Sequence, residues 1–237
     1  MKYKFAITVG ELCAARLFAS SDLSRLVLNG VRVEVRSGGV VLVACDGRSL
    51  AVLRSEQLAE EGTYALIIPS DTIDRVKTKT KKTSVLFADY DDEAGTISFS
   101  MPGVFTLRSE VIDGTYPNWR MTLPTVSGSD SAGAAIPDLC VNPELFQRLL
   151  KAGKLLGRTD GVSVRFTGPN GAIEVKLCNV PQFYGLIMPM RNVDPAIPHP
   201  GWLNDDWNPS RKPRPTPGWP SNAAKSKCSG WINDANN

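Results

Sequence analysis

One pattern restricts the possible folds of this chain more than any other feature: a strand, a capped helix and three further strands, repeated three times within residues 1–191. The first copy begins with KYKFAIT. Thr8 and Glu11 follow with T-x-x-E spacing, which predicts a capping box and a helix that ends at about Ser20. Three segments then alternate apolar and polar residues between glycine-containing turns, a pattern typical of half-buried strands joined by hairpins.

The second and third copies repeat this order. TYALIIP opens the second, Ser70 can cap its helix, and TSVLFADY, TISFSM and VFTLRSEV follow as strands. The third begins near IPDLCV, Asn142 caps a helix with Pro143 at its first position, and VSVRFT, AIEVKL and FYGLIMPM follow. We therefore predict an α+β fold of β-α-β-β-β units, with antiparallel sheets outside and helices collected on one face.

The predicted third helix, which extends to about Leu156, has two distinct faces. Its apolar stripe consists of Leu145, Phe146, Leu149 and Leu150. Its basic row, at i+3 spacing, consists of Arg148, Lys151 and Lys154. We expect the stripe to pack on the strands of the same unit and the basic row to face outward.

Several kinds of chemistry find no support in the sequence. The single histidine, His199, lies outside the three units, so they cannot hold a Ser-His-Asp or Cys-His centre. Five cysteines without a CxxC pair indicate reduced thiols rather than a zinc site. We expect a protein that is not an enzyme and has no metal or other cofactor.

No apolar run approaches the roughly 20 residues of a membrane helix. The N-terminal stretch also lacks the continuous apolar core of a signal peptide. These features predict a cytoplasmic protein without a membrane partner.

Basic residues gather on two of the predicted helices. Residues 70–82 hold five bases and two acids, and residues 142–158 hold four bases and one acid, so each stretch carries +3 within a chain of net charge +3. A protein that contacts a polyanion with one face would have this distribution, and so would two solvated helix faces.

The composition changes near residue 192. Residues 195–237 contain eight of the 17 prolines and four of the five tryptophans, without helical or strand periodicity. We predict a disordered Pro/Trp-rich tail over 192–237. The preceding chain is predicted to divide into two units over 1–124, a linker over 125–134 and a third unit over 135–191.

Four stretches together resemble the bacterial DNA sliding clamp, the beta subunit of DNA polymerase III. They are LNGVRVEV (28–35), VACDGRSLAV (43–52), VIDGTYPNW with the following LP (111–124), and LIMPMR (186–191). The resemblance implies that 1–124 corresponds to the clamp's middle domain and 135–191 to the second half of its last domain. It thus suggests a shortened clamp that lacks the first domain and half of the last.

The resemblance also implies a hydrophobic cleft that binds short peptides from partner proteins. Its residues would be Leu28, Cys45, Gly47, Arg48, Ser49, Leu50, Pro124, Leu186, Met188, Pro189, Met190 and Arg191. Leu and Met side chains provide adaptable apolar surface for such anchors. The chain departs from the family where clamps have threonine (Cys45) and His-Arg (Arg48-Ser49), so the arginine would point to the opposite face of an extended segment.

For DNA, the resemblance and the charge pattern together predict non-specific contact with duplex phosphates. The residues assigned are Arg25, Arg75, Lys77, Lys79, Arg148, Lys151 and Lys154. The predicted function is a sliding-clamp-like processivity factor that forms a homo-oligomer and recruits polymerase or other replication proteins, with a clamp loader as a further partner. The alternative is a clamp-like adaptor or decoy that binds the same peptides without encircling DNA.

Overall fold

The computed structural model of the chain describes residues 1–36, 39–57, 59–60, 62–124, 140–157, 161–167 and 171–190. The first repeat contains β1 (Lys2–Thr8), α1 (Val9–Arg16), η1 (Leu26–Leu28), β2 (Gly30–Arg36), β3 (Gly39–Cys45) and β4 (Ser49–Ser55). The second contains β5 (Thr63–Pro69), α2 (Ser70–Lys79), β6 (Val85–Asp91), β7 (Thr96–Met101), β8 (Phe105–Glu110) and the short helix η2 (Trp119–Thr122). The third contains α3 (Pro143–Leu156), β9 (Val162–Phe166), β10 (Ile173–Leu177) and β11 (Phe183–Ile187).

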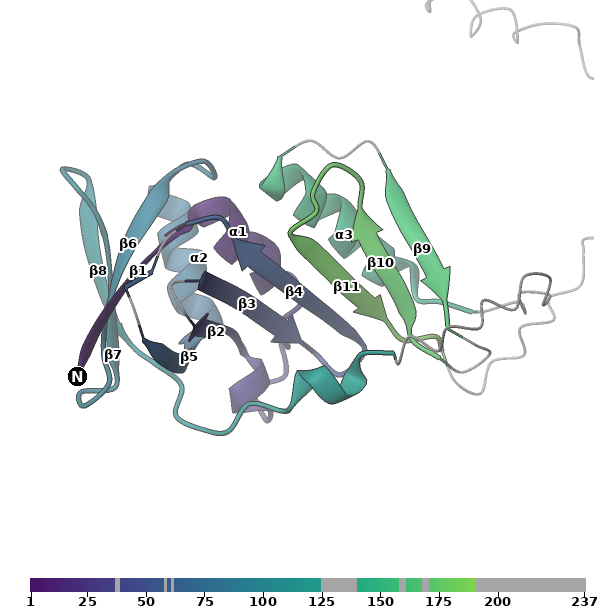
Figure 1. Cartoon of the computed structure of the whole chain (residues 1–237), viewed down its shortest axis with the longest axis horizontal. Helices are drawn as coiled ribbons and strands as arrows, with labels where there is room; N and C mark the ends of the chain where they lie inside the picture. Colours follow the sequence, from purple (N-terminus) through teal and green to yellow (C-terminus); the bar gives the residue numbers. More distant parts are fainter. Residues whose placement is uncertain are drawn as a thin grey trace, which may run out of the picture. The chain divides into compact units, whose positions relative to one another are not determined.

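The predicted α+β class is confirmed, and every strand pairing is antiparallel. The first two repeats exchange their opening strands, because β1 pairs with β6 and β5 pairs with β2. One sheet has the order β1-β6-β7-β8, and the other has the order β5-β2-β3-β4-β11-β10-β9 (Figure 1). The third repeat therefore joins the first through β4 and β11, and residues over 100 positions apart become neighbours.

The main core lies between the strands and the three helices. α1 is buried from Val9 to Ala15 and packs against both α2 and α3. A Cβ atom at Gly10 would lie only 2.6 Å from the Leu155 carbonyl oxygen and 2.9 Å from that of Lys82. Glycine at this position therefore allows the end of α3 and the segment after α2 to approach the start of α1.

Two of the three predicted caps are present. The third is wrong: Ser70 is the first residue of α2, whose N-cap is Pro69 without a side-chain cap hydrogen bond. The Glu11 carboxylate accepts hydrogen bonds from the Thr8 backbone N–H at 2.8 Å and from the buried Ser55 hydroxyl at 3.0 Å, and Thr8 Oγ1 accepts from the Glu11 N–H. Asn142 caps α3 by accepting from the Glu144 N–H. The two helices thus begin where the sequence predicted.

Other expectations differ in detail. α1 ends at Arg16 rather than near Ser20, because the chain turns there toward η1. Leu150, placed in the apolar stripe of α3, is 56% exposed, whereas Ala152 and Gly153 are buried in its place. The opening strand expected in the third repeat falls mostly on 136–139, outside the described residues, and Cys140 and Val141 are not in a strand. The predicted linker and tail also lie outside the described residues.

Candidate functional site

A second apolar cluster lies on the face of the seven-stranded sheet that points away from the helices. Side chains alternate along a strand, so Ala51 and Leu53 of β4 belong to the main core while Leu50 belongs to this other cluster. Leu50 is paired in register with Leu186 of β11, so the cluster crosses the joint between the first and third repeats. We call it the outer cluster; its buried members are Val43, Leu50, Ile67, Tyr116, Trp119 and Leu186.

Two residues assigned to the cleft pack on the outer cluster while remaining partly exposed. They are Leu28 of η1 and Cys45 at the end of β3. Burial raises the pKa of the Cys45 thiol, with smaller opposing effects from hydrogen bonds. The structure therefore brings Leu28, Cys45, Leu50 and Leu186 together from elements far apart in sequence, as the resemblance implied.

The segment that follows β8 covers part of the outer cluster. The Cys45 backbone N–H donates to the Tyr116 hydroxyl at 3.0 Å, and the Trp119 indole donates to the Glu34 carboxylate at 3.2 Å. Both aromatic residues belong to VIDGTYPNW, one of the stretches that resemble the clamp, but the resemblance assigned no role to either. The sequence feature that could have indicated a role is the motif YPNW, which places two aromatic side chains three residues apart.

Glu34 of β2 anchors this segment at its far end. Although it is only 5% exposed, its carboxylate accepts from Arg32 Nε at 2.8 Å and from Arg120 Nη2 at 2.7 Å. The Arg120 guanidinium also lies over the Trp119 ring, 4.2 Å from its centroid. Burial alone would raise the pKa of Glu34, but the hydrogen bonds from Arg120, Arg32 and Trp119 outweigh it and lower the pKa to about 2.

The turn between β3 and β4 is held by Asp46. One of its carboxylate oxygens accepts from the backbone N–H groups of Arg48 at 2.9 Å and Ser49 at 2.8 Å. Gly47, between Asp46 and Arg48, adopts a φ of +86°, a conformation that glycine takes without strain. The candidate residues Gly47, Arg48 and Ser49 are therefore fixed as one turn beside the outer cluster.

Arg148 of α3 binds the other carboxylate oxygen of Asp46 and also donates to the Ser49 hydroxyl at 2.9 Å. Burial would raise the pKa of Asp46, but the hydrogen bonds from Arg148 and the turn lower it overall. The guanidinium of Arg148, which was assigned to DNA contact, is thus engaged within the chain, where it ties the third repeat to the first.

The last described residues continue from β11 along the same turn. The Met188 N–H donates to the Arg48 carbonyl at 2.8 Å, and the Met190 N–H donates to the Cys140 carbonyl at 2.8 Å. Met188 and Pro189 are partly exposed, whereas Met190 is 49% exposed. Pro124 is partly exposed and, like Met188, Pro189 and Met190, is not a member of the outer cluster; Arg191 lies outside the described residues.

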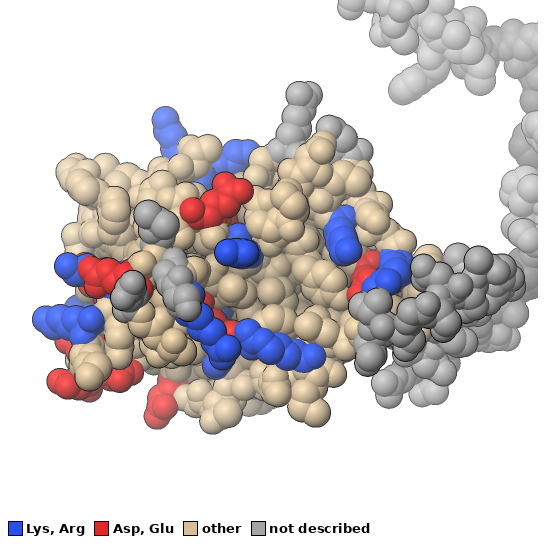
Figure 2. All heavy atoms as spheres, in the orientation of Figure 1, with Lys and Arg blue, Asp and Glu red and all other residues tan. Residues whose placement is uncertain are grey.

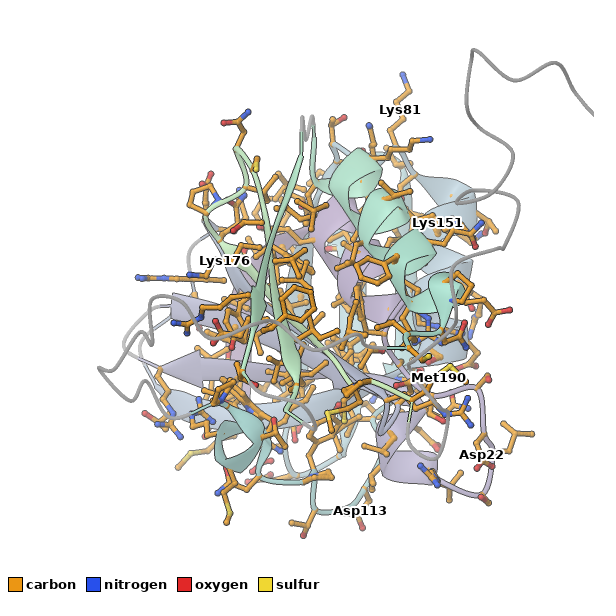
Figure 3. The ribbon with its side chains drawn as sticks, turned by 90° about the vertical axis from the view of Figure 1, so that its right-hand side faces the viewer. Asp22, Lys81, Asp113, Lys151, Lys176 and Met190 are labelled. Carbon is orange, nitrogen blue, oxygen red and sulfur yellow. The ribbon has the colours of Figure 1, made fainter. Side chains whose placement is uncertain are left out.

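The basic side chains lie mostly with the helices. Arg75, Lys77 and Lys79 of α2 are exposed, as are Lys151 and Lys154 of α3. Figure 3 shows Lys81 and Lys151 projecting on the helix side of the sheet, whereas Lys176 of β10 projects on the opposite side. On the face shown in Figure 2, basic and acidic side chains are interspersed rather than gathered into one patch.

Arg25 does not join this helix group. It forms an ion pair with Asp22 at 3.6 Å, and its guanidinium lies 3.1 Å from the position that a Cβ of Gly47 would take. Arg25 is thus a neighbour of the β3–β4 turn.

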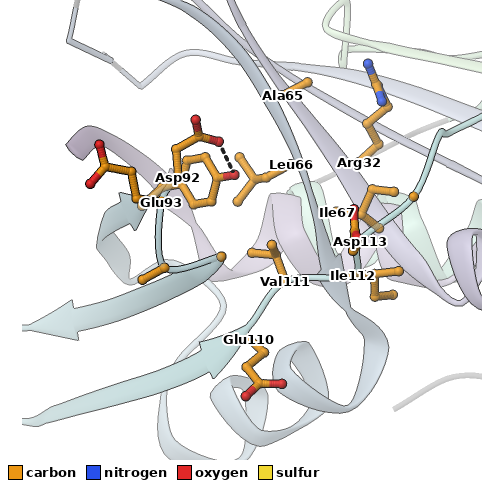
Figure 4. A pocket seen from close by; sticks show the side chains of 14 residues that line it. Arg32, Ala65, Leu66, Ile67, Asp92, Glu93, Glu110, Val111, Ile112 and Asp113 are labelled. Carbon is orange, nitrogen blue, oxygen red and sulfur yellow. Dashed lines mark hydrogen bonds between the residues drawn. The ribbon is translucent and has the colours of Figure 1, made fainter. Parts of the chain in front are cut away.

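A separate pocket lies between β5, the β6–β7 turn and the segment after β8 (Figure 4). Leu66, Ile67, Val111 and Ile112 provide apolar lining, and the Tyr90 hydroxyl donates to the Asp92 carboxylate at 2.9 Å. Within the described residues, no group of three or more His, Cys, Asp or Glu side chains is placed to hold a metal ion. No described helix has the length and apolar character needed to cross a membrane.

Four of the six buried members of the outer cluster, Val43, Leu50, Ile67 and Tyr116, lie in a stretch that matches a known protein family. Residues 11–118 match the family model for the central domain of the DNA polymerase III beta subunit. This stretch, somewhat under half of the chain, belongs to the DNA polymerase III beta sliding-clamp family. Sliding clamps are not enzymes, in agreement with the expectation from the sequence.

Curated sliding clamps match a part of the chain of similar length. The beta sliding clamp of Synechococcus elongatus is 30% identical over 113 residues, which are 46% of this chain and 30% of that protein. The beta sliding clamp of Pseudomonas aeruginosa is 28% identical over 106 residues, which are 42% of this chain and 27% of that protein. The chain therefore matches less than a third of the length of these relatives.

Solved clamp structures share the fold over a longer part. The beta subunit of Thermotoga maritima has a TM-score of 0.63 at 17% identity, covering 81% of this chain and 66% of that one. The Pseudomonas aeruginosa clamp bound to griselimycin has a TM-score of 0.61 at 20% identity, covering 79% and 65%. The sliding-clamp fold thus extends beyond the matched central domain.

Proposed function

We propose that this chain is a sliding-clamp-like processivity factor that contacts duplex DNA without sequence preference and recruits replication proteins through short peptides. One observation carries the proposal. The seven-stranded sheet has the outer cluster on one face and the exposed bases of α2 and α3 on the other side, so two partners can be bound at once. A polymerase and a clamp loader would both be recruited through the peptide site.

The peptide site would centre on the β4–β11 joint. Leu50 and Leu186 are buried there and form the floor, whereas Leu28 and Met188 at its margin retain exposed surface for a bound side chain. A few buried anchors usually carry most of the affinity for a peptide. The partner would be a short segment that ends in bulky apolar residues.

Met188→Glu tests the peptide site. We expect calorimetric titration with a clamp-binding peptide to show binding by the wild-type chain and at least a tenfold loss in the variant, because a carboxylate would be desolvated against the apolar anchor. Circular dichroism should show an unchanged fold, since Met188 is only partly buried.

Val104→Glu is the matched control. Val104 is 61% exposed in the turn between β7 and β8, in the other sheet, and its substitution adds the same charge. Equal affinities of the wild type and Met188→Glu, or no binding by the wild type, would contradict the assignment of the cleft.

The DNA surface would consist of the exposed bases on the helix side, now without Arg148. Phosphate contacts release counterions, so affinity should fall steeply with salt. We expect Lys151→Glu to weaken binding to a duplex of mixed sequence and to lower the salt slope by about one unit. Lys176→Glu makes the same change on the opposite side of the sheet and should leave both quantities unchanged. Equal losses in the two variants would show that the helix side is not the DNA surface.

One observation favours the adaptor or decoy alternative: the internal ion pair of Arg148 removes a base from the helix side. The two functions separate in one experiment. Peptide binding without measurable DNA binding at low salt would support the adaptor, whereas binding of both would support the processivity factor.

A further inference from the structure

The seven-stranded sheet ends in a strand whose outer edge has no partner among the described residues. β9 is the last strand in the order and pairs only with β10, with Val164 opposite Val175. Unpaired strand edges are usually blunted by lysine, proline, a bulge or a covering segment. β9, with the sequence VSVRF, has neither lysine nor proline, and its one charged residue, Arg165, is paired with Glu174.

The hydrogen bonds of the neighbouring loop show which groups face this open edge. The Gly161 carbonyl accepts from the Cys178 N–H, so the backbone groups of residue 161 point toward the β10 side. Backbone groups alternate along an antiparallel strand. The N–H and C=O groups of Val162, Val164 and Phe166 therefore point away from β10, into the open edge.

The apolar side chains next to this edge are also incompletely covered. Val164 is 38% exposed and Phe166 is 40% exposed, although their strand partners Val175 and Ile173 belong to the main core. Leu150 of α3 is 56% exposed. Arg148 reaches the β3–β4 turn, so Leu150, two residues further along the helix, lies on the side of α3 away from that turn and toward the open end of the sheet.

We propose that β9 pairs with β9 of a second copy of this chain, as an antiparallel two-fold contact centred on Val164. Two-fold contacts are the commonest in homo-oligomers. In this register Val164 faces Val164, and Val162 faces Phe166 of the second copy, so the apolar side chains lie opposite apolar ones. All outward N–H and C=O groups of the five residues find partners.

Charge selects this register over its neighbours. On the other face, Arg165 lies opposite Ser163 of the second copy. A shift that centres the contact on Arg165 would place two guanidinium groups directly opposite each other, which is destabilising. The contact would extend the sheet across both copies and cover Val164 and Phe166. It stands independently of the peptide and DNA sites proposed above.

Sedimentation equilibrium of the full chain, over a series of concentrations, tests the proposal. We expect the wild type to approach twice the 25.7 kDa chain mass and to stop there, because the contact consumes the edge on both copies. Val164→Lys should shift the equilibrium to monomer by placing two ammonium groups across the two-fold axis. Val104→Lys, at a valine that is 61% exposed in the other sheet, should remain dimeric.

Val164→Pro gives an independent variant. The Val164 N–H makes no bond to β10, so proline there removes a donor only from the intermolecular contact, as edge strands tolerate. Hydrogen exchange of the wild type should also slow at the Val164 amide as concentration rises. A monomeric wild type, a dimer retained in both Val164 variants, an assembly beyond two copies or a concentration-independent Val164 amide would each overturn the proposal.

Discussion

Glu34 shows how a single buried carboxylate holds the covering segment on the outer cluster. Its folded pKa of about 2 lies below its ordinary value of 4.5, so the ionised form is favoured by folding. The stabilisation is complete above the ordinary pKa and is lost as the pH falls from about 4.5 through about 2. We expect Glu34→Gln to lower the free energy of unfolding at pH 7 by about 2 kcal/mol.

Denaturant unfolding of the wild type and Glu34→Gln at pH 7 and pH 3 measures this effect. The difference between them should shrink at pH 3, because the wild-type carboxylate is then losing its advantage. Glu110→Gln, at an exposed position of β8, should show no difference at either pH. A Glu34→Gln effect of the same size at both pH values would mean that packing, and not charge, anchors the segment.

Among the elements, the sequence predicted most accurately those with local signals. The capping box at Thr8 and the Asn142-Pro143 start of α3 are both present, because their hydrogen bonds join residues within one helical turn. The end of α1 was misplaced, since it depends on the tertiary path toward η1.

The arrangement of α3 shows the same limit. The helical spacing of its apolar residues predicted correctly that Leu145 and Leu149 would be buried. It could not predict that Leu150 would be 56% exposed, or that Arg148 would be engaged by Asp46, 102 residues away. Both outcomes depend on how the third repeat packs on the first, and periodicity carries no information on that.

At the scale of the whole molecule, the pairing of β4 with β11 makes the candidate peptide site possible. It places Leu50 beside Leu186 and the Met188 backbone beside Arg48, so one surface is built from the first and third repeats. Only the resemblance to clamps predicted that these residues converge. The same joint leaves α2 and α3 on the other side of the sheet, with Lys77, Lys79 and Lys151 exposed.

In the proposed function, peptide and DNA occupy opposite sides of one sheet. The most direct test is calorimetric titration of the full chain with a clamp-binding peptide, first alone and then saturated with duplex DNA at low salt. We predict the same peptide affinity in both titrations, because the outer cluster and the basic helices do not share a surface. Loss of peptide binding when DNA is bound, or displacement of DNA by the peptide, would show that the two ligands share a surface.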